Sequence, residues 1–188
     1  MASTHIHLAI AKRYLEKHGH EIADKKAFCD GNILPDYEKA KANSHYGNRS
    51  ETKDLLKRHQ EKVSPQNFLQ KNSLDSDLNR GIFLHLHTDW NYYNNFLSHD
   101  YLKNIEFSQL IKDNCRTWNE HESYLDTKHK GLLNLISMRD QVEMAQKTWR
   151  REDSQTGNLQ FATKDLDAFI EKMSDVSISD LATHYTTA

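Results

Sequence analysis

Helix-breaking residues are scarce in this chain. Only 2 of its 188 residues are proline and only 6 are glycine. Both types interrupt helices, so their scarcity over this length favours long helices. Hydrophobic residues make up 37% of the chain and charged residues 28%, which is enough for a packed core and argues against global disorder. The length fits a single domain spanning residues 1–188, since a second domain would leave both small.

Apolar residues recur at helical spacing along most of the chain. The strongest pattern covers residues 75–98, where Asp75 or Ser76 can cap the first turn. Pro65 is expected to break the helix before it. Residues 37–50 and 152–158 lack this periodicity and are predicted loops. The expected fold is an all-α bundle of about six or seven helices. Besides 75–98, the predicted helical segments are 3–18, 21–30, 51–62, 105–125, 132–149, 163–173 and a short turn at 177–181.

Charge, hydropathy and cysteine content limit the location and the partners. The formal net charge of -2 gives no overall positive charge that would indicate a nucleic-acid partner, and it leaves a local basic patch open. No stretch approaches the roughly 20 apolar residues of a membrane span, and the N-terminus has no apolar signal core. Cys29 and Cys115 lack CxxC spacing and suit a reducing compartment. These features predict a cytoplasmic protein without a membrane span.

Histidine is abundant, with 12 residues, and it is the commonest metal ligand in proteins. His85 and Asp89 are four residues apart, which places both on one helix face. Chance alone gives about one such pair for 12 histidines and 16 aspartates, and His20 with Asp24 is a second. The surroundings distinguish the two pairs. His85 and Asp89 lie in the most apolar segment, where a polar pair needs a partner, either a metal ion or each other.

Three further residues offer nitrogen or oxygen ligands from separate segments. His5 opens the first predicted helix, Asp36 follows Pro35, and His45 lies in a predicted loop. Each alone is an ordinary surface residue. Together with the pair at 85 and 89 they give the mixture of imidazole and carboxylate that zinc prefers.

Four short motifs occur in order along the chain. They are Thr4-His5, GNILPD ending at Asp36, Ser44-His45-Tyr46, and GIFLHLHTD ending at Asp89. This order resembles the zinc-dependent phospholipase C family, in particular its small bacterial branch, and more distantly the single-strand-specific zinc nucleases. The resemblance covers about residues 4–97, and the family fold is an all-α bundle.

The resemblance implies a metal-dependent phosphoesterase, a hydrolase of phosphodiesters. Asp36, His45, His85 and Asp89 would hold one metal ion, and Asp36 would also activate the attacking water. Asp89 would bridge to a second ion bound by His5, which the family completes with its N-terminal amine. The expected cofactor is one or two zinc ions, with iron or manganese as alternatives. The expected substrate is a phosphoester, either a small molecule or a lipid head group.

The chain also departs from this family. The next family histidine would fall near Asn95, a poor zinc ligand, although His99 lies one turn further on. The later His-x3-Glu pair is absent, and only His121 or Glu122 could substitute in that region. These departures leave open a catalytically inactive metal-binding or regulatory domain.

Two further patterns have alternative interpretations. His99-Asp100 matches the adjacent pair of helical His-Asp phosphohydrolases, with His45 or His85 as the first ligand and Asp126 as the last. The aromatic residues after Asp89 fit either core packing or the wall of a substrate cleft. Histidines in charged surroundings are expected at the surface; they are His18, His20, His59 and His129.

Overall fold

The computed structural model describes residues 2–38, 44–48, 52–149 and 157–187. These residues form helices and no β-strand, with one isolated bridge between Tyr46 and Val63, which confirms the all-α prediction. No helix in these ranges has both the length and the apolar character needed to cross a bilayer. The α-helices are α1 (Thr4–His18), α2 (Lys25–Gly31), α3 (Leu34–Tyr37), α5 (Leu55–Lys62), α6 (Pro65–Lys71), α7 (Asp77–Asn91), α8 (His99–Asn104), α9 (Phe107–Lys128), α10 (Arg139–Trp149), α11 (Thr163–Met173) and α12 (Ile178–Thr187). Three short elements are η1 (Gly19–Glu21), the π-helix η2 (Tyr92–Phe96) and η3 (Leu132–Leu135).

The described residues form more helices than the sequence pattern predicts, and several of these helices are shorter than expected. The predicted segment 75–98 is α7 followed by η2, and Ser76 caps its start by accepting from the backbone N–H of Asn79. Helix α5 ends at Lys62, before Pro65, as the sequence predicts. Pro65 itself begins α6, because a residue in the first helical turn needs no backbone donor. The predicted loop 152–158 lies outside the described residues except for 157 and 158.

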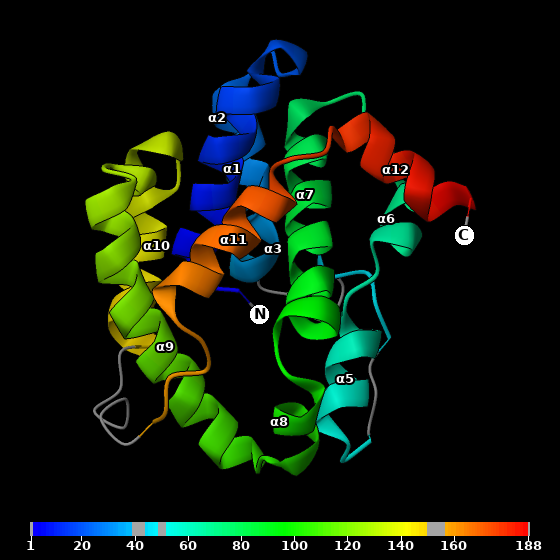
Figure 1. Ribbon diagram of the computed structural model, residues 1–188. Helices are drawn as coiled ribbons and strands as arrows, with labels where there is room; N and C mark the ends of the chain where they lie inside the picture. Colours follow the sequence, from blue (N-terminus) through cyan, green and yellow to red (C-terminus); the bar gives the residue numbers. More distant parts are fainter. Residues whose placement is uncertain (1, 39–43, 49–51, 150–156, 188) are drawn as a thin grey trace.

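Helix α1 lies at the centre of the fold. The Ser3 side chain caps it by accepting from the backbone N–H of Ile6, and every residue from Thr4 to Ala11 is buried. Helices α2, α7, α9 and α11 all pack against it (Figure 1). A helix covered on all sides must also bury its polar side chains, so His5 and His7 lie inside the protein.

Helices α2 and α7 cross at very short range. Gly31 ends α2 and Gly81 lies near the start of α7, and a Cβ on either would overlap backbone atoms of the opposite helix. The Asn32 side chain donates to the carbonyl oxygen of Gly81 at 3.2 Å across this crossing. The crossing thereby fixes the end of α2 against α7, one turn before His85.

Candidate metal centre

A cluster of polar side chains lies buried between α1, α3, α7 and residues 44–48. Asp36, His45, His85 and Asp89, hereafter the four-residue cluster, each expose 5% of their surface or less, as does His7. Two overlapping groups have ligand atoms within 4.8 Å of one another. One is His7, His85 and Asp89; the other is Asp36, His45 and His85. The structure thus brings together the four residues that the family resemblance assigns to one metal ion, and their role as ligands remains a prediction.

The separations inside the four-residue cluster match those of a metal site. His45 Nε2 lies 3.3 Å from His85 Nε2, 3.4 Å from Asp89 Oδ2 and 3.7 Å from Asp36 Oδ1. His85 Nε2 lies 3.6 Å from Asp89 Oδ2. Bonds of 2.0–2.2 Å in a tetrahedral zinc site put the ligand atoms about 3.4 Å apart. An ion of zinc's size therefore fits between these atoms.

The backbone of α2 selects the tautomer of His85. Its Nδ1 lies 2.9 Å from the carbonyl oxygen of Asn32. A carbonyl oxygen only accepts hydrogen bonds, so Nδ1 carries the proton and donates it. In the neutral ring Nε2 is then an unprotonated lone pair, directed into the cluster. Fixing a histidine ligand through its other nitrogen is typical of metal sites.

Ser44 selects the same tautomer for His45. The Ser44 hydroxyl donates to the carbonyl oxygen of Pro35 at 2.8 Å, which uses its single proton. Its Oγ lies 3.0 Å from His45 Nδ1 and accepts from that nitrogen, so Nε2 of the neutral ring is unprotonated as well. Two bare nitrogens and Asp89 Oδ2, which has no hydrogen-bond partner, therefore face one another. Such a group of acceptors could hold a metal ion between them.

The protonation states favour cation binding. Burial lowers the pKa of His85 well below its ordinary value of 6.5. Burial alone would raise the pKa of Asp89, but the neighbouring imidazoles of His45, His7 and His85 hold it well below its ordinary value. Neutral imidazoles and an ionised carboxylate are the forms that bind divalent metal.

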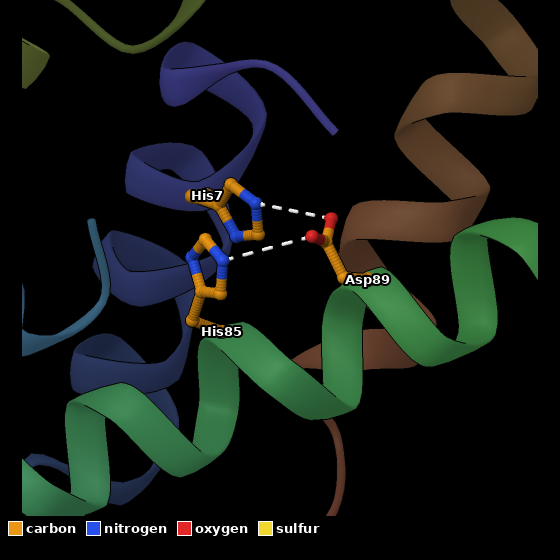
Figure 2. Close-up of side chains that lie close together, drawn as sticks. All are labelled: His7, His85 and Asp89. Carbon is orange, nitrogen blue, oxygen red and sulfur yellow. Dashed lines mark ion pairs between the residues drawn. The ribbon is translucent and has the colours of Figure 1, made fainter. Parts of the chain in front are cut away.

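His7 is the site residue that the sequence interpretation missed. Its ring stacks on His85, with centroids 3.9 Å apart, and its Nε2 lies 3.4 Å from Asp89 Oδ1. Figure 2 shows both imidazoles beside the carboxylate, His7 from α1 and the other two from α7. Asp89 Oδ1 also accepts from the backbone N–H of Ala2 at 2.9 Å. A sequence signal existed, because His7 shares a helix face with Ala11 and Tyr14, which are both buried.

His5 faces a different group of side chains. Its Nδ1 lies 3.3 Å from Glu122 Oε1 and its Nε2 lies 3.4 Å from Asp126 Oδ1, with Gln146 also within 3.5 Å. Glu122 and Asp126 are one turn apart on α9. His5 belongs to neither group of candidate ligands in the described part of the chain, and His7 has the place beside Asp89. A second ion at His5 remains a prediction.

The other candidate ligands lie outside both groups. His121 is buried, its ring centroid lies 4.8 Å from that of Phe161, and its Nδ1 has no hydrogen-bond partner within the described ranges. His99 is exposed and its Nε2 lies 2.9 Å from the carbonyl oxygen of Asn94. Asp100, the second half of the His-Asp pair, is exposed as well.

Comparisons with protein-family models, with curated proteins and with solved structures found no match to this chain. The geometry of the cluster is therefore the evidence for a metal site, and the resemblance to phospholipase C remains an expectation.

Proposed function

We propose that this protein is a metal-dependent phosphoesterase that hydrolyses a phosphodiester. The observation that carries the proposal is the convergence of His45 Nε2, His85 Nε2 and Asp89 Oδ2 at 3.3–3.6 Å, where both nitrogens present lone pairs when the two rings are neutral. Zinc is the expected ion, with iron or manganese as alternatives, because these ions take mixed nitrogen and oxygen ligands.

The ligand types favour a catalytic metal over a structural one. Structural zinc sites are rich in cysteine, whereas catalytic sites combine imidazole and carboxylate. Burial raises the pKa of the Cys29 thiol to about 12, so this residue stays protonated. The four-residue cluster contributes two imidazoles and two carboxylates. This composition is the one expected where a water molecule is to be activated.

Each residue of the four-residue cluster has a part in the proposed reaction. His45, His85 and Asp89 hold the ion, and a bound zinc ion would acidify a coordinated water and stabilise charge on the phosphoryl oxygens. Asp36, with Oδ1 3.7 Å from His45 Nε2, has two carboxylate oxygens. It can therefore face the ion with one and accept the proton of the attacking water with the other. His5, Glu122 and Asp126 are the residues that would hold a second ion.

Metal analysis and an activity assay test the proposal together. We expect the purified protein to bind at least one equivalent of zinc, iron or manganese, and His85→Ala to abolish this binding. The matched control is His20→Ala, from the second His-x3-Asp pair, because His20 is 76% exposed. Less than about half an equivalent of metal, unchanged by His85→Ala, would contradict a metal site.

Hydrolysis of bis(p-nitrophenyl) phosphate with added zinc or manganese separates an enzyme from an inactive domain. We expect activity that Asp36→Asn and His45→Ala both abolish. A metal-loaded but inert protein would instead support the metal-binding or regulatory domain. Loss of metal in His99→Ala would favour the His-Asp type of phosphohydrolase.

A further inference from the structure

His59 on α5 is a histidine whose ring nitrogens are both buried and have no hydrogen-bond partner among the described residues. The expectation that it lies at the surface is therefore wrong for its polar atoms. Its ring stacks on Tyr93, with centroids 4.3 Å apart and planes 7° from parallel. A buried polar atom without a partner costs stability, so two on one ring call for a physical reason.

Tyr93 connects His59 to the four-residue cluster. His85, Asp89 and Tyr93 follow one another at intervals of four residues along α7 and into η2, so they continue along one side of the helix. The π-helix begins at Tyr92, directly after α7, and such turns occur frequently at functional sites. His59 is thus stacked against the residue one turn beyond the Asp89 carboxylate.

The electrostatic surroundings keep His59 neutral. Burial lowers its pKa to about 3, the positive charges of Lys62 and Arg58 add to this shift, and the charge of Asp89 opposes it. At neutral pH one of its nitrogens carries a proton and the other a lone pair, and no group in the described part of the chain uses either.

We propose that His59 is a substrate-binding residue of this site, donating a hydrogen bond to a non-bridging oxygen of the phosphoester held at the four-residue cluster. The inference rests on the proposed function. It assigns His59 to the substrate and not to the metal ion. The ligand class is a phosphate group with an anionic oxygen, whose negative charge strengthens a hydrogen bond from imidazole.

His59→Phe is the decisive variant, because phenylalanine keeps a ring on Tyr93 and removes both nitrogens. We expect full metal content and a value of kcat/KM for bis(p-nitrophenyl) phosphate about 10- to 100-fold lower, the effect of losing one hydrogen bond to a charged group. We also expect the Tm of the metal-free protein to rise by about 3 °C, because two unpaired polar atoms are gone. A purely structural histidine would give a lower Tm. His59→Gln, which restores a donor, should recover part of the activity.

The outcomes separate this inference from the proposed function. Wild-type kcat/KM in His59→Phe at full metal content overturns the role of His59 and leaves the phosphoesterase standing. Loss of metal, or failure of this variant to fold, overturns the role too. A wild-type protein that binds metal but does not hydrolyse the phosphodiester contradicts the proposed phosphoesterase function. It then contradicts the role of His59 as well. His20→Phe, at an exposed position, is the matched control and should change neither kcat/KM nor metal content.

Discussion

The Nε2 atoms of His45 and His85 face each other at 3.3 Å in the buried interior, and each ring already donates through its Nδ1. Two lone pairs at this distance repel, and the ionised Asp89 beside them accepts as well. Without a cation the cluster therefore destabilises the fold. With a cation the same three atoms become a source of stability.

Metal removal should accordingly lower thermal stability. A metal present at 100 times its Kd stabilises the folded protein by about 2.7 kcal/mol, which corresponds to a Tm about 5–10 °C higher at this chain length. Differential scanning fluorimetry with zinc and with a chelator measures the difference. His85→Ala should show no such response, and equal metal-dependent shifts in both proteins would contradict a site at His85.

His7→Phe tests the contact to Asp89 Oδ1. Phenylalanine keeps the stack on His85 and removes the nitrogen that lies 3.4 Å from the carboxylate. Groups that orient a metal ligand typically change the affinity 10- to 100-fold when they are lost. We expect a loss of about that size in a zinc titration, with the helical circular dichroism spectrum unchanged. An affinity equal to that of the wild type would show that His7 only packs.

The stability of the metal-free protein should fall in acid, with a contribution from His59. Its pKa is about 3 in the folded protein, below the ordinary value of 6.5 expected when unfolded. Between these values the unfolded chain binds a proton that the folded chain does not, so stability is complete above about pH 6.5 and decreases as the pH falls toward 3. Urea unfolding of wild type and His59→Phe from pH 7 to pH 4 measures this. The variant should show the smaller decrease, and parallel curves would contradict a buried neutral His59.

Gly81→Ala should damage both the fold and the metal site. The added Cβ would overlap the carbonyl oxygen of Phe28 and crowd the backbone N–H of Asn32, so α2 and α7 must move apart. We expect a loss of about 1–3 kcal/mol in unfolding free energy and weaker zinc binding, because Asn32 would no longer hold His85. In the control Gly19→Ala, the new Cβ meets only the Lys25 side chain at 3.9 Å, and both quantities should stay near those of the wild type.

Local sequence signals predicted much of the fold. Ser76, one of the two expected caps, caps α7, and the apolar spacing placed α1, α7 and α11 within one or two residues of their bounds at the N-terminal end. The change from α7 to η2 after Asn91 was not predicted, because a π-turn keeps the same apolar residues and is stabilised by tertiary contacts such as Tyr92 with Phe161 and Phe169.

The candidate site was only partly predictable, for similar reasons. The four-residue spacing of His85 and Asp89 is expected about once by chance in a chain of this composition, so the spacing alone carries little information. The apolar surroundings of the pair and the order of the four motifs made the pair a candidate. His59 has Arg58 and Lys57 as sequence neighbours, which suggests solvent, yet the stack on Tyr93 buries its nitrogens. This stack joins residues that are distant in the sequence, so no local sequence pattern can predict it.

The hydrogen bond that orients the His85 ring is accepted by the backbone carbonyl oxygen of Asn32. Any amino acid at position 32 carries a carbonyl, so substitutions there can spare this contact even though they remove the side-chain bond to Gly81. The tautomer of His85 that the proposed metal site requires depends instead on how closely α2 and α7 approach each other. A mutational survey of this protein would then find sensitive positions for metal binding among glycines that touch no ligand.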